Sequence, residues 1–433
     1  MVKVKLAYGR KGIEVELPQG QIQIIEPRYR KGGRDQAGMV LEALREPIGS
    51  PPLGELVSQE DRVGIIINDI TRATPNEIIL PVLIKELENA GVSSGNIILF
   101  NATGTHRLNT KEELTGILGE KIAADYRIVQ NNAGEQATFV KAGTTSRGTE
   151  IRLNREFMDC NMHILTGFIE PHFFAGFSGG PKAIMPGMAS LETIITNHGP
   201  ANIDHPGATW GITRGNPIWE EMLEAARMVP RRFLLNVTLN RNKEITGVFA
   251  GEMEEAHSRG CLFARESAMM EAECPFDIVI TTNSGYPLDL NLYQTVKGMS
   301  TALQIVKKGG AIVVASECRE GIPEHGSYGK LLREAENPDA LLKKIRSAGF
   351  HEVDSWEAQI HALVCKKADV YIYSDGLTDK QIREAMLRPS HSIEETVEEL
   401  LKKYGNKARI CVLPEGPQTI PYLRDLSHVS QGT

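Results

Sequence analysis

The sequence predicts an α/β protein, built as two α/β domains whose sheets are mostly parallel. Short continuous apolar runs, each suited to a buried parallel strand, alternate with helical patterns along the chain. The chain of 433 residues also exceeds the usual size of a single hydrophobic core. Together, the alternation and the length indicate two helix-covered sheets rather than one.

The alternation of strands and helices restarts around Cys274 and Pro275. We therefore place the domain boundary at 270–276, and expect an N-terminal domain of residues 1–272 and a C-terminal domain of residues 273–416. Residues 417–433 form a tail, and the sequence leaves open whether this tail packs back on the N-terminal domain.

The N-terminal domain begins with a predicted hairpin, in which the segments 3–8 and 13–18 alternate polar and apolar residues around a turn with two glycines. Buried strands are expected at 62–68, 96–100, 162–168 and 233–239. Helices are expected at 76–90, 110–119 and 252–270. The second of these helices opens with the capping-box residues Thr110 and Glu113.

The C-terminal domain repeats the same alternation. Its strands are expected at 277–285, 309–316, 369–374 and 408–414, where the first range includes the loop that follows the strand. Its helices are expected at 293–307, 327–336, 338–348, 356–366 and 391–405. A parallel sheet covered by helices accounts for this order.

The composition indicates a soluble cytoplasmic protein. Hydrophobic residues make up 41% of the chain, charged residues 24%, and the net charge of −7 disfavours binding to nucleic acid or to an anionic membrane. The six cysteines show no CxxC spacing, which is typical of a reduced protein without a thiolate metal site. The N-terminus lacks the apolar core of a signal peptide, and no apolar run is long enough to span a bilayer.

Chemistry-bearing residues gather in loops that directly follow predicted strands, where open α/β sheets bind ligands. In the first loop, Asp69 and Arg72 are placed to orient each other, and Thr71 and Arg72 are suited to hold a phosphate or carboxylate. A helix cap with a surface ion pair explains this loop equally well. In the second loop, His106 is either an acid/base near neutral pH or a structural hydrogen-bonding residue.

The third loop, residues 167–187, contains five glycines together with His172 and Lys182. Its segment 178–182 combines small residues, exposed amides and a cation, as phosphate-binding loops do, although it is not a Walker A motif. No GxGxxG sequence occurs in this loop. The alternative is a Gly-rich turn with a solvated lysine. His198 lies sixteen residues after Lys182, and its spacing alone favours a structural role.

The fourth loop leads into the predicted helix that starts at 293. Gln294 and Lys297 are three residues apart, so they share one helix face and could clamp a carboxylate. A solvated helix face is the competing interpretation. Trp356, one of three tryptophans, packs either in the core or along a pocket wall.

In their order along the chain, these loops resemble the lactate racemase family that uses a nickel-pincer nucleotide. The resemblance covers nearly the whole chain, and the stretch from Pro171 to Lys182 is its most specific part. It is carried by the motifs Asp69-x-Thr71-Arg72, Thr103-Gly104-x-His106-Arg107, Pro171-His172-Phe173-Phe174-x-Gly176-x-Ser178-Gly179-Gly180-x-Lys182, Asn197-His198 and Tyr293-Gln294-x-x-Lys297.

The resemblance implies an N-terminal domain that binds the cofactor, with an active site in the cleft between the two domains. Lys182 matches the lysine that joins the pyridinium mononucleotide through a thioamide, and His198 matches the nickel ligand. His106 and His172 match the acid/base pair. The remaining matches line the cofactor (Asp69, Ile70, Thr71, Arg72, Ser178, Gly179) or lie near the substrate (Arg72, Phe174, Tyr293, Gln294, Lys297, Trp356).

The implied chemistry suits these residue types. The hydrogen on the α-carbon of a 2-hydroxy acid is poorly acidic, so its removal as hydride, while a histidine takes the hydroxyl proton, is easier than proton abstraction. A transient 2-keto acid then accepts the hydride on either face. The opposite stereoisomer requires a base on the other side, which accounts for two histidines. Proteins that synthesise the cofactor are the implied partners.

Three alternatives remain open from the sequence. The same chemistry could act on malate, on a sugar acid such as gluconate or on an aromatic 2-hydroxy acid, and Phe174, Tyr293 and Trp356 favour a short aliphatic or aromatic side group. A non-catalytic protein that holds the cofactor would need no histidine pair. A zinc hydratase or aldolase using His106, His172 and His198 would leave Lys182 without a role.

Overall fold

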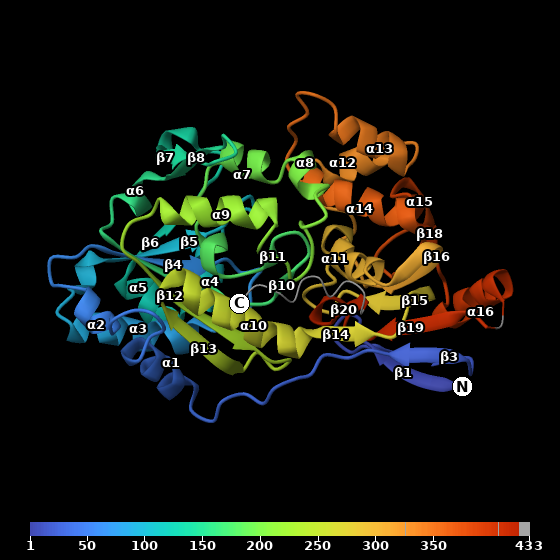
Figure 1. Ribbon diagram of the computed structural model, residues 1–433, viewed down its shortest axis with the longest axis horizontal. Helices are drawn as coiled ribbons and strands as arrows, with labels where there is room; N and C mark the ends of the chain where they lie inside the picture. The colour runs from blue at the N-terminus through green and yellow to red at the C-terminus, as the bar shows by residue number, and fades with distance from the viewer. Residues whose placement is uncertain (325, 406, 424–433) are drawn as a thin grey trace. The chain divides into compact units, whose positions relative to one another are not determined.

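A computed structural model describes residues 1–324, 326–405 and 407–423, and the chain forms two compact units (Figure 1). Unit 1 comprises Met1–Arg28, Gly199–Asp204 and Ala268–Thr433, and unit 2 comprises Tyr29–His198 and His205–Ser267. Both units are α/β, with six-stranded sheets that are mostly or wholly parallel. The predicted fold class is therefore confirmed.

The sheet of unit 2 carries most of the predicted site loops at the ends of its strands. Its order is β13-β12-β9-β4-β5-β6, and all neighbours are parallel except β12 and β13. The central strands are almost entirely buried apolar runs, as expected for parallel strands. The strands are β4 (Val63–Asn68), β5 (Ile97–Ala102), β6 (Arg127–Gln130), β9 (Met162–Phe168), β12 (Arg232–Leu239) and β13 (Ile245–Gly251).

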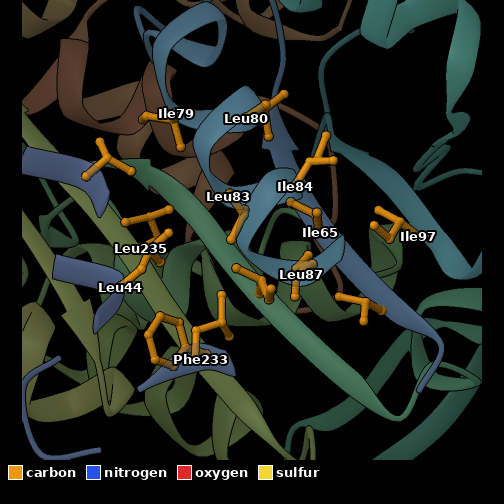
Figure 2. Packing of buried hydrophobic residues seen from close by; sticks show 14 of the residues in the cluster. Leu44, Ile65, Ile79, Leu80, Leu83, Ile84, Leu87, Ile97, Phe233 and Leu235 are labelled. Carbon is orange, nitrogen blue, oxygen red and sulfur yellow. The ribbon is translucent and has the colours of Figure 1, made fainter. Parts of the chain in front are cut away.

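The core of unit 2 lies between this sheet and the helices α1 (Gln36–Arg45) and α3 (Asn76–Asn89). Figure 2 shows Leu83 and Leu87 of α3 packed near Ile65 of β4, with Phe233 and Leu235 of β12 in the same cluster. α10 (Met253–Ala268) packs in a separate cluster that includes Ile169 and Phe249. Both clusters exclude water from the body of the sheet.

Shorter elements complete unit 2. The helices are α2 (Leu53–Leu56), α4 (Lys111–Leu118), α5 (Glu120–Asp125), α6 (Arg155–Met158), α7 (Leu191–Asn197), α9 (Pro217–Arg227) and the 3₁₀ turns η1 (Ser94–Asn96), η2 (Gln136–Thr138) and η3 (Gly180–Ala183). Two antiparallel pairs are formed by β7 (Phe139–Thr144) with β8 (Glu150–Asn154), and by β10 (Pro171–His172) with β11 (Gly176–Phe177).

The sheet of unit 1 is wholly parallel, in the order β18-β17-β16-β15-β19-β3. Its strands are β3 (Gln21–Ile24), β15 (Phe276–Thr282), β16 (Val306–Ala315), β17 (Asp369–Tyr373), β18 (Arg388–Pro389) and β19 (Arg409–Leu413). Its helices are α11 (Leu292–Leu303), α12 (Tyr328–Glu334), α13 (Pro338–Ile345), α14 (Ser355–Lys367), α15 (Asp379–Glu384), α16 (Ile393–Tyr404) and the 3₁₀ turn η4 (Gly416–Gln418).

The N-terminal residues Met1–Arg28 belong to unit 1, whereas the sequence analysis expects residues 1–272 to form one domain. The hairpin of β1 (Val2–Leu6) and β2 (Ile13–Leu17) forms as predicted, but its apolar side chains pack into the core of unit 1. β3 then adds an edge strand beside β19. In the tail, β20 (Ile420–Leu423) pairs in parallel with β14 (Met269–Ala272), and residues 424–433 lie outside the described chain.

A short segment that lies between the two parts of unit 2 in the sequence also belongs to unit 1. α8 (Pro200–Ile203) lies in the segment Gly199–Asp204, which follows His198 directly. The guanidinium of Arg346 makes two hydrogen bonds of 2.7 Å to the carboxylate of Asp204. The amide of Gln359 donates to the Pro200 carbonyl at 3.0 Å. These contacts tie the segment to α13 and α14.

The predicted elements agree with the structure in type, with one boundary that shifts appreciably. The predicted helix 293–307 ends at Leu303 because β16 begins at Val306. The sequence analysis did not identify α1, α9 or the β7–β8 hairpin. No helix in the described ranges combines the length and the apolar character needed to cross a membrane.

Truncation of Leu83 to alanine is expected to destabilise unit 2 by about 2–5 kcal/mol, since this fully buried side chain would leave a cavity against the sheet. Chemical denaturation followed by circular dichroism measures the loss. The matched control is Leu262→Ala on α10, where the side chain is 56% exposed. Equal losses for the two variants would contradict the described core.

Candidate active site

Two of the predicted site residues, Asp69 and His106, form a hydrogen-bonded pair in unit 2. Asp69 follows β4 and His106 follows β5, and because these strands are parallel neighbours, both residues lie at the same edge of the sheet. Oδ2 of Asp69 lies 2.8 Å from Nδ1 of His106. Oδ1 of Asp69 accepts hydrogen bonds from the backbone N–H and the hydroxyl of Thr71, at 2.7 and 2.5 Å.

The environment of Asp69 determines how His106 is held. Burial favours the neutral acid, but the hydrogen bond and charge of His106, the charge of Arg72 and the Thr71 hydroxyl outweigh it, and the pKa of Asp69 lies well below its usual range. Asp69 is therefore a hydrogen-bond acceptor, and Nδ1 of His106 donates to it. In the neutral imidazole, the lone pair then lies on Nε2.

The other two residues of the first loop are held less tightly. Ile70 is 46% exposed, and its backbone N–H donates to Oδ1 of Asn109 at 3.4 Å. The backbone N–H of Arg72 donates to the Asp69 carbonyl at 3.0 Å, which closes a tight turn. The turn leaves the Arg72 guanidinium near the Asp69 carboxylate, whose pKa its charge helps to lower.

The Gly-rich loop after β9 folds as the β10–β11 hairpin followed by η3. The hydroxyl oxygen of Ser178 accepts from the backbone N–H of Glu170 at 3.0 Å and donates to the Phe168 carbonyl at 3.0 Å, so it closes the turn. Gly179 has a φ of 74°, and a Cβ there would lie 2.4 Å from Oδ1 of Asn236. Only glycine fits this position. The turn leads into η3, which carries Lys182.

His172, Phe174 and His198 form a chain of ring contacts in unit 2. The ring centroids of His172 and Phe174 are 4.6 Å apart, those of Phe174 and His198 are 4.9 Å apart, and both contacts are edge-on. All three side chains are buried. The structure therefore brings two predicted functional histidines to either side of one predicted substrate-binding phenylalanine.

His198 is held as a neutral imidazole. Burial, followed by the positive charge of Lys182, lowers the pKa of His198 to about 3. Its Nδ1 lies 2.9 Å from Oδ1 of Asn197. Lys182 and His198 are thus electrostatic neighbours, which the sequence placed only sixteen residues apart along the chain.

The imidazole of His172 is bonded differently from that of His106. The backbone N–H of Ala175 donates to Nδ1 of His172 at 3.3 Å. In a neutral ring with this bond, the hydrogen lies on Nε2. The two predicted acid/base histidines are therefore held in opposite tautomers.

In unit 1, the remaining predicted residues cluster where α11 and α14 begin. Nζ of Lys297 donates to Oε1 of Gln294 at 2.8 Å, which confirms that the two share a helix face. The hydroxyl of Tyr293 donates to Oδ1 of Asp354 at 3.2 Å. Burial comes first among the causes that raise the pKa of Tyr293 well above its usual value, followed by the charges of Asp354 and Glu357. Trp356 is buried beside these groups.

Glu357 is the charged group that the sequence analysis missed. Its side chain is buried, and within the described chain its Oε1 atom has no hydrogen-bond partner. Burial raises the pKa of Glu357 to about 8, with the charge of Lys297 opposing this rise and that of Asp354 adding to it. Glu357 follows Trp356 directly on α14, a helix whose first seven residues are all buried and which therefore shows no polar face.

The structure thus brings the predicted residues together in three groups, two in unit 2 and one in unit 1. Unit 2 holds the Asp69–His106 pair and the group of His172, Phe174, Lys182 and His198. Unit 1 holds Tyr293, Gln294, Lys297 and Trp356. Among residues 1–324, 326–405 and 407–423, no cluster of three or more His, Cys, Asp and Glu side chains is arranged to hold a metal ion, so the three histidines of the zinc alternative form no such cluster there.

Comparison with known proteins identifies the family. Residues 8–211 match the lactate racemase N-terminal domain, and residues 271–420 match the lactate racemase C-terminal domain. The chain is 35% identical to the lactate racemase of Thermoanaerobacterium thermosaccharolyticum over 97% of its own length and 99% of the relative's. The chain belongs to the lactate racemase family. The lactate racemase of Lactiplantibacillus plantarum is also 35% identical, over 96% and 99% of the two chains.

Solved structures agree with membership of the lactate racemase family, whose members are isomerases. The lactate racemase apoprotein from T. thermosaccharolyticum superposes with a TM-score of 0.91, at 34% identity, and covers 97% of this chain and 100% of its own. A Thermotoga maritima protein, 19% identical, has a TM-score of 0.69 over 91% of this chain and all of its own, and shares the fold. The family relationship therefore extends through both units.

Replacement of Glu357 by glutamine is expected to remove a pH dependence of stability. The folded chain keeps the Glu357 proton up to about pH 8, whereas the unfolded chain releases it near 4.5. Between these two pH values, folding therefore takes up a proton. The contribution of Glu357 to the free energy of unfolding falls over this interval and is lost once the pH has risen through 8. Relative to the wild type, the free energy of unfolding of Glu357→Gln should rise by a few kcal/mol from pH 5 to pH 8, at about 1.4 kcal/mol per pH unit. Above pH 8 the difference should stay constant.

Urea denaturation at pH 5, 6.5, 8 and 9 measures this difference. Glu399→Gln, at an exposed position of α16, is the control and should follow the wild type throughout. A constant offset between Glu357→Gln and the wild type over this range would show that Glu357 is ionised in the folded protein.

Proposed function

We propose that this chain racemises lactate or another small 2-hydroxy acid, with a nickel-pincer nucleotide attached at Lys182 and bound through nickel to His198. The proposal is supported above all by the contact chain His172–Phe174–His198 beside Lys182. It groups an acid/base side chain, an apolar wall and a metal ligand with the lysine that carries the cofactor. The relatives from two bacteria are named lactate racemases.

The residues present fit such a cofactor. A metal ligand must offer the lone pair of a neutral imidazole. Burial keeps His198 neutral at ordinary pH, and the Lys182 charge adds to this effect before the cofactor is attached. Nδ1 of His198 is engaged by Asn197, which directs the other ring nitrogen to the metal. When bound, the cofactor supplies a hydride acceptor for the substrate α-carbon. Proteins that synthesise and load this nucleotide are the expected partners.

His106 is arranged to take the substrate hydroxyl proton. Its Nδ1–H bond to Asp69 fixes the ring, exposes the Nε2 lone pair and stabilises the imidazolium that proton uptake creates. The side chain of His106 is 33% exposed, so a substrate can reach it. This pair is the orienting half of the arrangement seen in catalytic triads.

His172 serves the opposite stereoisomer in this proposal. With Nδ1 accepting from Ala175, the neutral ring presents an Nε2–H donor. To take a proton at Nε2, His172 must release the Ala175 contact and move its hydrogen to Nδ1. At 3.3 Å this contact is long for a hydrogen bond, which keeps the cost of releasing it low.

Cationic side chains are proposed to bind the substrate carboxylate. Arg72 and Lys297 are the cationic residues proposed for this role, since each can form a charge-assisted hydrogen bond, and Gln294 holds the Lys297 ammonium in place. Phe174, Tyr293 and Trp356 are proposed to contact the side group of the acid. Because these three are aromatic, we favour lactate or an aromatic 2-hydroxy acid over malate and gluconate.

The cofactor assignment is tested by intact mass after co-expression with the cofactor-synthesis proteins. The wild type is expected to carry an adduct that peptide mapping places on Lys182, and Lys182→Ala is expected to lose both adduct and activity. Lys85→Ala, which replaces an exposed lysine of α3, is the control and should keep both. Racemisation by a protein of unmodified mass would overturn the assignment.

The substrate assignment is tested by polarimetry with both enantiomers of lactate, malate and 3-phenyllactate, and with gluconate epimerisation followed by chromatography. Turnover of lactate or phenyllactate at least tenfold above that of malate and gluconate is expected. Activity confined to gluconate would overturn the assignment of an aromatic wall.

Replacement of Asp69 by asparagine is expected to lower kcat about 10²–10⁴-fold, with KM nearly unchanged. Since Thr71 donates twice to one oxygen of residue 69, the asparagine oxygen must face Thr71 and its NH₂ must face His106. Nδ1 of His106 then accepts, and the hydrogen moves to Nε2, where a base is needed. Steady-state kinetics with each lactate enantiomer measures the effect.

The matched control is Asp61→Asn, which breaks the ion pair with Arg231 elsewhere in unit 2. It should reduce stability and leave kcat within a few-fold of the wild type. If Asp69→Asn turned over as fast as Asp61→Asn, His106 would not act as the base.

A further inference from the structure

A buried carboxyl group, Glu221 on α9, has hydrogen-bond partners on both oxygens. Oε1 accepts from the hydroxyls of Thr145 and Thr149, at 2.9 and 2.6 Å. Oε2 accepts from Nδ2 of Asn197 at 3.2 Å. The side chain is 1% exposed, and burial of a carboxyl is unfavourable unless such partners satisfy it. Two segments of unit 2, the turn between β7 and β8 and the end of α7, thus converge on this side chain of α9.

These contacts fix which way the amide of Asn197 faces. Its Nδ2 atom lies 3.2 Å from Oε2 of Glu221 and 3.2 Å from the carbonyl oxygen of Ile218. Both neighbours are acceptors, so the NH₂ group must occupy that side. The amide oxygen is consequently directed to Nδ1 of His198, at 2.9 Å. An amide oxygen only accepts, so Nδ1 of His198 carries the hydrogen.

We propose that Glu221 and Asn197 are positioning residues that hold His198 in its Nδ1–H tautomer, with the Nε2 lone pair directed to the nickel of the cofactor. The metal part of this inference rests on the function proposed above, whereas the tautomer stands on the contacts of the chain alone. Partners of this kind orient a ligating imidazole and raise its basicity.

The arrangement sets the tautomer in steps, each of which depends on the one before. The two threonine hydroxyls orient the Glu221 carboxyl, the carboxyl orients the Asn197 amide, and the amide orients the ring. Without the Glu221 acceptor, only the Ile218 carbonyl still holds the NH₂ group of Asn197, so a turned-over amide, which presents its NH₂ to Nδ1, becomes more populated. Nδ1 would then accept, and the hydrogen would lie on Nε2, where it blocks metal binding.

The tautomer is measured by ¹⁵N NMR of the full-length apoprotein labelled at the histidine ring nitrogens. The His198 signals are assigned by their absence in His198→Gln. The wild type is expected to show a protonated Nδ1 and an unprotonated Nε2. A wild-type His198 with its hydrogen on Nε2 overturns the proposal without any need for a variant at Glu221.

Two replacements of Glu221 separate positioning from packing. Glu221→Gln can turn its amide oxygen to Asn197 and its NH₂ to the threonine oxygens, so it should keep the Nδ1–H tautomer. Glu221→Met has similar length but no acceptor, and because the Ile218 carbonyl then holds the Asn197 amide alone, it should show a larger fraction of the Nε2–H form. Glu224→Gln, on the same helix but facing Ser146, is the control and should match the wild type. Identical tautomers in the Met and Gln variants contradict the role of Glu221.

The role of Glu221 in nickel binding is tested separately, by the rate of nickel release. Nickel release from loaded protein to a chelator should be 10–100-fold faster in Glu221→Met than in the wild type, and restored in Glu221→Gln, in line with other residues that hold metal ligands. Equal release from all variants, with the tautomer shifted in Glu221→Met, refutes only the metal part. Absence of any adduct on Lys182 refutes the proposed function and leaves the tautomer result standing.

Discussion

The candidate site in unit 2 depends on one buried carboxylate, Asp69. Parallel strands end at a common edge, so the first polar residue after each strand faces the first polar residues after its neighbours. Asp69 uses this geometry to join the loop after β4 to the loop after β5, through His106. Its remaining oxygen is saturated by Thr71. A carboxylate held on both sides cannot rotate, and it fixes the imidazole beside it.

Three buried groups of the candidate site each stay in one protonation state. Asp69 stays ionised because hydrogen bonds and positive charges outweigh its burial. His198 stays neutral because burial and the Lys182 charge act in the same direction. Glu357 in unit 1 keeps its proton because burial and Asp354 outweigh Lys297. Burial thus keeps two of these groups neutral, whereas in Asp69 hydrogen bonds and positive charges outweigh it.

The sequence allowed most of the fold to be predicted, because buried parallel strands are continuous apolar runs that stand out from their surroundings. α9 was missed although Asn216 caps it and Pro217 occupies its first turn, two signals that a search for helix starts would have found. The placement of β3 beside β19 could not be predicted, because pairing between distant segments leaves no local pattern.

For the site, strand ends alone predicted where Asp69 and His106 would lie. Individual histidines were harder to interpret. His163 and His198 are both buried histidines, but His163 is bonded to two backbone carbonyls and serves structure. Only tertiary contacts separate these cases. The sequence did not indicate that Glu221 and Glu357 are buried. A buried glutamate on a helix cannot be distinguished in the sequence from a solvated one, because the difference lies in its tertiary neighbours.

The discontinuity of unit 1 has a consequence for biosynthesis. Gln21 in β3 pairs with Arg409 in β19. Unit 1 also includes the segment Gly199–Asp204, which lies between two parts of unit 2 in the sequence. During translation, β3 therefore cannot pair with β19 until residues Arg409–Leu413 have been synthesised. Unit 2, which ends at Ser267, can condense long before that moment. Long-range pairing of this kind is intrinsically slow, so the completion of unit 1 is expected to be the slower of the two folding events.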